Sequence, residues 1–345
     1  MPNTAIFIVW KVYQRRVEAL QSALQTSTVY FHYAWEEASK IHKALSYLCK
    51  FVHTLVVLYR CQPDLIYVQA PPTFAIYATW LYSRWYGVPY VVDAHNPMIY
   101  DSFWPKLPWA TYVLRQAQRV IVHNTYVAAR ARELGLPAAA LRVLIDRPAE
   151  VEPASFPFPK AIFGNRHPPR VVVPCSFDAD EPLDDLQRVT HLLPDVTFFI
   201  TWYYEKLPRD YVESFGENTV FTGFLPLEAF NALLAHADVI VSLTTRDGTQ
   251  PSVASEALAF QRPLVISDLP MVRELFPRGA IYVANDAAAM AAGIRTALHR
   301  QRDLEADMTA FKAEKVRLWE KQFATFKADL AGCAIPQRTS ARSRL

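Results

Sequence analysis

Residues 237–270 read ADVIVSLTTRDGTQPSVASEALAFQRPLVISDLP. The segment begins with β-branched residues typical of a buried strand at 238–243, continues into a polar loop, and turns helical at Pro251 and Ser252. A second apolar strand follows at 264–267. A strand, a loop, a helix and another strand in this order are the repeating unit of a parallel α/β sheet, whose functional loops lie at the carboxyl ends of the strands. The stretch therefore predicts an α/β fold with a site after the strand at 238–243.

The same alternation runs through the rest of the 345-residue chain. Strand-like segments alternate with helical patterns, at 5–9, 29–33, 65–69, 90–94 and 120–123 in the first half and at 170–174, 196–201, 219–222 and 280–283 in the second. A proline-rich stretch at 146–169 separates the halves, and such a stretch resists both helix and sheet. We expect two Rossmann-like, doubly wound domains facing each other across a cleft. Their predicted ranges are 1–160 and 161–330, with a terminal helix at 304–330 packing back on the first domain and a disordered tail at 331–345.

The composition excludes several classes of protein. With 36 Lys and Arg against 33 Asp and Glu, the formal charge of +3 is too close to balance for a protein that wraps nucleic acid. The four cysteines include no C-x-x-C pair, so we expect neither a zinc site nor a disulfide framework, and we expect a cytoplasmic location. We also expect no other metal and no cofactor. Residues 5–10 lack the features of a signal peptide. The longest apolar runs are shorter than the ~18 residues that span a bilayer.

The helix that opens at Pro251 has the features of an anion site. Its first N–H groups have no partner inside the helix, and together with the positive end of the helix dipole they suit a diphosphate. Glu256, about one turn further on, could accept hydrogen bonds from the two hydroxyls of a ribose. With Gln250, Ser252 and Val253 it forms the predicted substrate-binding set on this segment. The alternative is structural, with Ser252 capping the helix and Glu256 favouring its dipole.

The run SEALAFQRPLV at 255–265 carries a family resemblance. It resembles the donor-binding segment of the retaining glycosyltransferases of family four, whose pattern is E-x-x-G-x-x-x-x-E-A-x-x-x-G-x-P. Glu256, Ala257 and Pro263 occupy the end of that pattern. The resemblance implies the GT-B fold and transfer of a hexosyl unit from a nucleoside diphosphate sugar. The family's first glutamate falls on Gly248 here, which leaves Asp247 as the nearest carboxylate for contact with the transferred sugar.

A second resemblance lies in the first half of the chain, where PDLIYVQAPP at 63–72 precedes a helix and then GVPYVVDAHN at 87–96. This order resembles the acceptor domain of the same glycosyltransferases and of the chitobiosyl-diphosphodolichol mannosyltransferases, as does VLIDRPAE at 143–150. His95 directly follows the predicted strand, where it can donate a hydrogen bond to a sugar hydroxyl or take a proton. We predict a catalytic role for His95, the alternative being a histidine held in the structure.

Three loops complete the predicted site. The first, WKVYQRRVEAL at 10–20, has no glycine, so Arg15 and Arg16 would bind phosphate by their charge, or else lie solvated on a surface helix. In FTGFLP at 221–226, the resemblance places Gly223 and Phe224 at the nucleotide base. The alternative is that these two residues only form a turn and part of the apolar core. The acids of CSFDADEP at 175–182 would repel a diphosphate unless a cation bridged them, and a helix-cap role for Ser176 or Asp178 is favoured.

These features predict a glycosyltransferase that moves a sugar from a nucleoside diphosphate sugar to a glycan or lipid-linked acceptor, in polysaccharide or glycoconjugate biosynthesis. Two alternatives stay open: a nucleotide-sugar epimerase of the same fold, and a catalytically silent protein that binds sugar nucleotides or a partner. The likeness to family four favours retention of configuration, and the likeness to the mannosyltransferases favours inversion.

Residues 39–60 have the pattern of an amphipathic helix that could bind a membrane surface. An apolar stripe at helical spacing comprises Ile41, Leu45, Leu48, Val52, Leu55 and Tyr59, and the cations off that stripe are Lys40, Lys43, Lys50 and Arg60. A basic amphipathic helix of this kind can lie on the inner face of a membrane, with the aromatic cluster around Trp104 and Trp109 as an anchor. The alternative is a helix that packs its stripe on the sheet.

Overall fold

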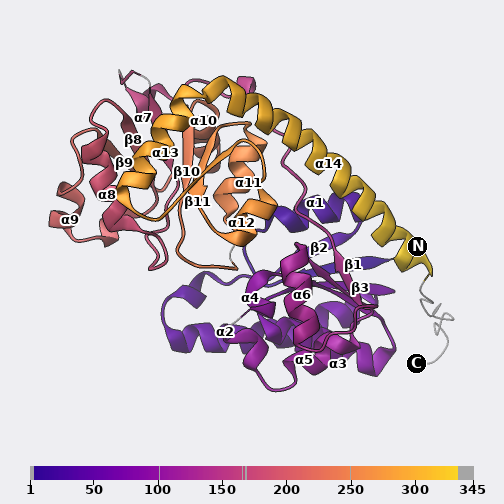
Figure 1. Cartoon of the computed structure of the whole chain (residues 1–345). Coiled ribbons are helices and arrows are strands. Elements are labelled where there is room, and N and C mark those ends of the chain that lie inside the picture. The colour runs from indigo at the N-terminus through magenta and orange to yellow at the C-terminus, as the bar shows by residue number, and fades with distance from the viewer. Residues whose placement is uncertain (1–3, 101, 165, 168, 249, 333–345) are drawn as a thin grey trace. The chain divides into compact units, whose positions relative to one another are not determined.

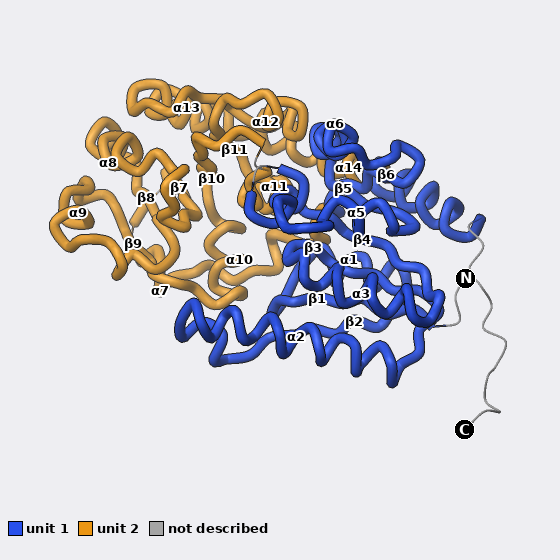
Figure 2. The backbone as a smooth tube through the Cα atoms, turned by 90° about the horizontal axis from the view of Figure 1, so that it is seen from below, with its two compact units in different colours: residues 1–147, 318–345 blue, residues 148–317 orange. Residues whose placement is uncertain are grey.

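The computed structural model describes residues 4–332 apart from residues 101, 165, 168 and 249. The chain divides into two compact units (Figure 2), unit 1 with residues 1–147 and 318–345 and unit 2 with residues 148–317. The first boundary thus lies near the start of the proline-rich stretch at 146–169, whereas the sequence placed it after residue 160. This stretch joins unit 2 because its aromatic residues pack there, with Phe156 against Phe260 and Phe163 against Phe199.

Unit 1 is built on a parallel sheet of six strands in the order β2-β1-β3-β4-β5-β6. The strands are β1 (Ala5–Val9), β2 (Ser27–Tyr30), β3 (Leu65–Ala70), β4 (Tyr90–Ala94), β5 (Arg119–Val122) and β6 (Leu141–Val143). The helices between them are α1 (Arg15–Leu24), α2 (Lys40–Cys61), α3 (Thr73–Tyr86), α4 (Asn96–Ile99), α5 (Ala110–Gln116) and α6 (Thr125–Glu133), with short 3₁₀ turns at Ala34–Glu37 and Trp104–Lys106 (Figure 1). The strands at 5–9 and 90–94 have the predicted bounds, β2 begins two residues before the predicted start at 29, and the short β6 is absent from the prediction.

Unit 2 repeats the plan with a parallel sheet in the order β12-β11-β10-β7-β8-β9. Its strands are β7 (Arg170–Val173), β8 (Thr197–Thr201), β9 (Thr219–Gly223), β10 (Val239–Ser242), β11 (Leu264–Ser267) and β12 (Ala280–Val283). Its helices are α7 (Lys160–Phe163), α8 (Leu183–Leu192), α9 (Arg209–Glu213), α10 (Leu227–Ala235), α11 (Ser252–Ala259), α12 (Pro270–Leu275) and α13 (Ala287–His299), with 3₁₀ turns at Pro153–Ser155 and Tyr204–Lys206. Both sheets are doubly wound α/β sheets, as the sequence predicts.

Alternate residues of each strand face opposite sides of the sheet, and both sides are buried. In β1, Ile6 and Ile8 join one apolar core of unit 1, while Phe7 and Val9 join another. Helix α14 (Gln301–Gly332) covers this second core with Trp319 and its neighbours further along the helix.

Helix α14 serves both units. Leu304, in its first turn, belongs to the core of unit 2, whereas the part from residue 318 onwards belongs to unit 1. Asp329 near its end accepts hydrogen bonds from Arg119 and Arg142 of unit 1, the latter at 2.8 Å. Residues 331 and 332 are helical, and the rest of the tail predicted to be disordered lies outside the described residues.

Helix α2 departs from expectation. Its 22 residues are long and apolar enough to cross a membrane by length and composition alone, although the sequence was expected to contain no such segment. Much of the apolar stripe of α2 does not pack on the sheet: Leu45, Leu48 and Val52 are exposed. The fully buried residues of the helix are Ser46, Lys50, Thr54 and Leu58, so its inward side combines polar and apolar residues.

Candidate functional site

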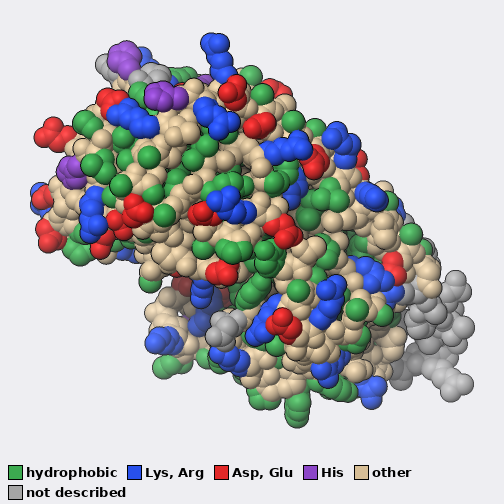
Figure 3. All heavy atoms as spheres, viewed as in Figure 1, with side chains coloured by type: hydrophobic (Ala, Val, Ile, Leu, Met, Phe, Trp, Pro, Cys, Tyr) green, Lys and Arg blue, Asp and Glu red, His purple; other side chains and the backbone are tan. Residues whose placement is uncertain are grey.

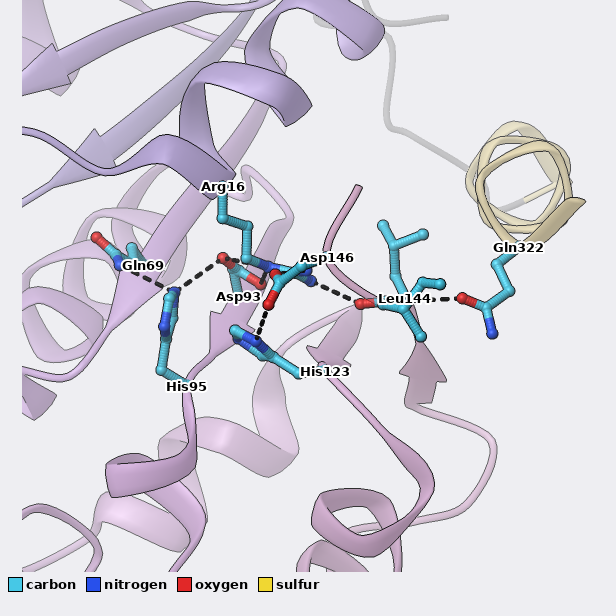
Figure 4. Close-up of polar contacts among 9 residues, drawn as sticks. Arg16, Gln69, Asp93, His95, His123, Leu144, Asp146 and Gln322 are labelled. Atoms are coloured by element: carbon cyan, nitrogen blue, oxygen red, sulfur yellow. Dashed lines mark hydrogen bonds and ion pairs between the residues drawn. The ribbon is translucent and has the colours of Figure 1, made fainter. Parts of the chain in front are cut away.

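Polar side chains gather in unit 1 at the carboxyl ends of β3, β4 and β5 (Figure 4). Gln69 lies at the end of β3, Asp93 at the end of β4 with His95 just after it, and His123 directly after β5. In a parallel sheet the carboxyl ends of neighbouring strands share one edge, so the pairing of β3, β4 and β5 brings these residues together.

Arg16, on α1, organises this cluster. Its Nε donates to both carboxylate oxygens of Asp93, at 3.0 and 3.2 Å, its Nη1 donates to Asp146 at 2.7 Å, and its Nη2 donates to the carbonyl of Leu144 at 2.9 Å. Burial alone would raise the pKa of the Asp93 carboxyl, but Arg16, followed by His95, holds that pKa well below its usual range. The phosphate-binding role predicted for Arg16 is therefore corrected, because this guanidinium is buried and its donors already bind protein groups.

His95 is the reactive group that the cluster offers. Its Nε2 lies 2.9 Å from the amide nitrogen of Gln69 and 3.4 Å from Asp93, and its ring packs edge-on against His123 at 4.4 Å. Burial, and then the nearby His123, lower the pKa of His95 to about 4 against the opposing pull of Asp93. The imidazole is therefore neutral at pH 7 and can accept a proton or a hydrogen bond.

Two buried polar atoms beside His95 have no hydrogen-bond partner among the described residues. They are Oε1 of Gln69 and Nε2 of His123. Buried polar atoms are almost always paired, so these two atoms next to a neutral histidine give the cluster hydrogen-bonding capacity that the described residues do not use. Ligand atoms of Asp93, His95 and His123 also lie within 4.8 Å of one another, which is close enough to hold a metal ion. The guanidinium that already neutralises Asp93 makes a cation the weaker choice there.

Unit 1 also contains a cavity of about 440 Å³ beside α2. Aromatic rings form much of its wall, with Trp10 stacked on Tyr47 at 6.2 Å and Trp104 edge-on to Tyr47 at 5.9 Å. The buried ion pair of Lys50 and Glu36, at 2.5 Å, also lines the cavity. Aromatic faces with polar groups between them are chemically suited to a sugar ring.

Unit 2 holds a cavity of about 640 Å³ at the carboxyl edge of its sheet. It is lined by the loop after β7, the loops after β8, β9 and β10, and the start of α11. Five of the predicted substrate-binding residues line it, namely Phe224, Gln250, Ser252, Val253 and Glu256. The structure thus brings together most of the residues predicted in this half of the chain.

The start of α11 faces this cavity. The N-cap residue is Pro251, which makes no side-chain cap bond, and Ser252 is the first residue inside the helix. Ser252 is therefore not the cap that the structural alternative required. A helix start with no side-chain cap offers its N–H groups and positive dipole end to an anion in the cavity.

Hydrogen bonds hold the two loops opposite α11. The Glu181 carboxylate accepts from the backbone N–H groups of Ser176 and Asp178, at 3.0 Å each. Asp180 accepts from the hydroxyl of Thr244 at 2.6 Å, which ties the loop after β7 to the loop after β10. Glu181, and not Ser176 or Asp178, is thus the residue that accepts the loop's N–H groups, and these acids are occupied within the protein.

Arg246 is a lining residue that the sequence reasoning missed. Among the described residues of this cavity it is the one that carries a positive charge. Its backbone N–H donates to the Thr244 hydroxyl at 3.1 Å, so the same network holds its loop. This arginine follows β10, and a lone arginine in a polar loop gives no signal by itself.

Aromatic side chains form part of the wall of the unit 2 cavity. Phe224 stacks on Tyr203 at 5.0 Å and contacts Trp202 at 5.5 Å, and both Phe224 and Trp202 line the cavity. Gly223 ends β9 with a φ of 69°, a backbone conformation that glycine adopts without strain. Phe224 follows this turn directly and forms part of the cavity wall.

Two predicted residues, Arg15 and Asp247, line neither of the two cavities. Asp247 is exposed, its carboxylate accepts from the N–H of Gly248 at 2.8 Å, and it is not among the residues that line the cavity. Arg15 is half-buried on α1, next to Arg16. Their predicted roles stay predictions.

Two family models match the chain. The glycosyl transferase 4-like domain matches residues 13–145, and the glycosyl transferases group 1 domain matches residues 183–300. The first match falls within unit 1 and the second within unit 2. The chain therefore belongs to the glycosyltransferases of the GT-B fold, and the predicted fold is confirmed. No curated protein matches it in sequence.

Solved structures agree on the fold. The Anabaena protein Alr3699/HepE in complex with UDP-glucose matches with a TM-score of 0.69 at 14% identity, over 94% of this chain and 100% of that one. A glycosyltransferase from Rickettsia africae ESF-5 matches with a TM-score of 0.72 at 12% identity, over 96% and 99%. The UDP-GlcNAc 2-epimerase from Methanocaldococcus jannaschii also matches, with a TM-score of 0.56 at 12% identity, over 86% and 92%. The comparisons give no support to the resemblance to chitobiosyl-diphosphodolichol mannosyltransferases.

Proposed function

We propose that the protein transfers a hexosyl unit from a nucleoside diphosphate sugar to a glycan or lipid-linked acceptor. The observation that carries this proposal is the unit 2 cavity, where the start of α11, the charge of Arg246 and the carboxylate of Glu256 lie around one space. The helix start and Arg246 would bind the diphosphate, Glu256 would accept hydrogen bonds from the ribose hydroxyls, and the faces of Trp202 and Phe224 would stack on the base. The HepE protein, similar in fold, has been seen with UDP-glucose, which supports this class of donor.

Unit 1 supplies the second set of groups. The neutral His95, with the orphan atoms of Gln69 and His123 beside it, would hydrogen-bond a hydroxyl of the reacting sugar or accept a proton from the acceptor. The aromatic cavity of unit 1 would hold a sugar ring of the acceptor. In the reaction the bond from the anomeric carbon to the diphosphate breaks and a bond to the acceptor oxygen forms. Catalysis then comes chiefly from positioning and from stabilisation of the leaving diphosphate.

The acceptor would be made and used in the cytoplasm, at the inner face of a membrane, in the synthesis of a polysaccharide or glycoconjugate. A sugar chain grown on a lipid suits unit 1, whose aromatic cavity adjoins α2, the helix with the exposed apolar side.

Product analysis tests the proposal against its alternatives. The protein is incubated with a panel of nucleotide sugars, with and without a lipid-linked or glycan acceptor, and the products are separated by mass and by configuration. Transfer to the acceptor is the expected result. An epimerised nucleotide sugar without acceptor would favour the epimerase, a class whose fold matches this chain. Binding without any product would favour a silent sugar-nucleotide-binding protein.

A further inference from the structure

Helix α2 packs apolar residues such as Phe51 and Leu58 on unit 1 and exposes further apolar residues on another side. Ile41 is 80% exposed and Leu48 61%, whereas Lys50, on the opposite side, is 1% exposed. The exposed apolar residues lie along one side of the helix and are Ile41, Leu45, Leu48, Val52, Val56 and Tyr59, a set that we call the outer face. An amphipathic helix normally buries its apolar side, so this outer face needs a partner.

Buried polar bonds fix this orientation. Lys50 pairs with Glu36 at 2.5 Å, and Thr54 accepts a hydrogen bond from the indole of Trp10 at 3.0 Å. The Lys50 ammonium holds the pKa of Glu36 down to about 2, although burial alone would raise it. Turning the helix to bury its apolar residues would leave these polar groups unpaired, which is costly. The buried bonds of Lys50 and Thr54 therefore keep the outer face of α2 exposed.

The charges of α2 indicate which partner fits. The helix contains Lys40, Lys43, Lys50 and Arg60 and no Asp or Glu. Lys43 and Lys50 pair inward with Glu36 and Glu37, so Lys40 and Arg60, near the two ends of the helix, are the exposed cations that can face an anionic surface. A second copy of α2 would oppose cations with cations, which disfavours a dimer through this face.

Aromatic residues lie beside the carboxyl end of the outer face. Tyr59 contacts Tyr86 of α3 at 6.3 Å, and the neighbouring Trp85 is exposed. Tyrosine and tryptophan concentrate at the boundary between lipid headgroups and acyl chains. In Figure 2, α2 runs along the outer edge of unit 1, and Figure 3 shows hydrophobic, Lys and Arg side chains together on the surface of this unit.

We infer that α2 lies in the headgroup region of an anionic bilayer, with its outer face toward the acyl chains and its inner face still bound to unit 1. The helix does not cross the bilayer, because Lys50 and Thr54 hold its inner face against the fold. The same inner face lines the aromatic cavity through Lys43, Tyr47 and Lys50. A lipid-linked sugar could then enter that cavity while its lipid stays in the membrane. The delivery of a lipid-linked sugar to the cavity rests on the proposed function, whereas the contact of α2 with the membrane does not.

Vesicle flotation of the full-length protein tests the inference. With vesicles of equal parts phosphatidylglycerol and phosphatidylcholine at low salt, most of the protein should float, and pure phosphatidylcholine or high salt should lower the floating fraction several-fold. Leu48→Ser combined with Val52→Ser should lower it several-fold as well. The matched control is Leu192→Ser combined with Leu318→Ser, two exposed leucines outside α2, and it should float like the wild type.

Three results would overturn the inference. The wild type stays in the bottom fraction with the anionic vesicles, or the Leu48→Ser, Val52→Ser variant floats unchanged, or light scattering shows a dimer that this variant alone converts to monomers. Circular dichroism and melting temperature confirm that each variant is folded, as expected for substitutions at exposed positions. Nucleotide binding, measured on the same samples, separates a failure of this inference from a failure of the proposed function.

Discussion

At the residue scale, the bonds of Arg16 determine which groups of unit 1 remain available to a ligand. The guanidinium binds Asp93 and Asp146 and so fixes both carboxylates at the sheet edge. Arg16 lowers the pKa of Asp93, whereas His123, followed by Arg16, lowers the pKa of Asp146. Arg16 also adds positive charge near His95, which further lowers the pKa of the imidazole. An ionised, immobile acid beside a neutral histidine is an arrangement suited to holding that histidine in place for hydrogen bonding to a substrate.

Replacing His95 by Ala should lower turnover by roughly 10² or more, because positioned acid–base groups contribute about this much. Turnover is measured with the donor and acceptor found by product analysis, and a thermal melt reports on folding. The control is His299→Ala, at an exposed site on α13. Wild-type turnover combined with a lowered melting temperature would instead identify His95 as a structural residue.

The lowered pKa of His95 predicts a pH dependence of stability. The His95 imidazole has a pKa of about 4 in the folded protein, whereas its pKa in the unfolded chain is about 6.5. The unfolded state therefore binds more protons between these values, and the free energy of unfolding should fall as the pH drops from about 6.5 toward 4. Above about pH 6.5 the group contributes no pH dependence. Urea unfolding of the wild type and of His95→Gln, compared at neutral and mildly acidic pH, measures the difference. Identical pH dependence in the two proteins would contradict a buried neutral histidine.

Glu256→Ala should weaken binding of a nucleoside diphosphate by roughly 10- to 100-fold, since hydrogen bonds to a charged group contribute about 1.5 to 3 kcal/mol. Titration calorimetry gives the dissociation constant directly. Glu217→Ala, which removes an exposed carboxylate outside the cavity, is the control. Equal affinity in both variants would leave Glu256 with only its effect on the helix dipole.

At the element scale, the sequence predicts some features well and others not at all. The segment at 237–270 shows its strand, loop and helix through local residue types, and α11 and β11 form as expected. The Arg16 cluster could not be predicted this way, because Arg16, Asp93 and Asp146 are brought together only by the strand order of the sheet. Periodicity revealed the stripe of α2 but not which side of the helix is buried, since buried ion pairs outweigh the apolar pattern.

Trp319→Ala in α14 should cost about 3 to 5 kcal/mol of unfolding free energy, because it removes a large side chain from a core of unit 1. Trp319 is 5% exposed, whereas its neighbour Leu318 is 40% exposed. Leu318→Ala is therefore the matched control and should change stability little. Denaturant unfolding of both variants measures the difference, and similar losses in the two would show that this part of α14 does not belong to the core of unit 1.

At the scale of the whole molecule, each unit has its own apolar core, and the two need not unfold in one step. The proposed donor site lies wholly in unit 2, while the His95 cluster lies wholly in unit 1. A nucleotide should therefore act on the unfolding of one unit in particular, which makes its effect separable from general stabilisation.

A nucleoside diphosphate should increase the free energy of unfolding of unit 2 by about 2.7 kcal/mol at a hundredfold excess over the dissociation constant. The melting temperature of unit 2 should rise accordingly. Trp202 offers a local probe, since it is the only one of the eight tryptophans within residues 148–317 and it lines the cavity. UDP, GDP, ADP and TDP are compared by calorimetry and by tryptophan fluorescence. A base stacked beside Trp202 should change the emission in the wild type but not in Trp202→Phe, which keeps an aromatic face for stacking. If none of the four nucleotides shifts either signal, unit 2 does not hold the donor site, whatever the fold of the chain.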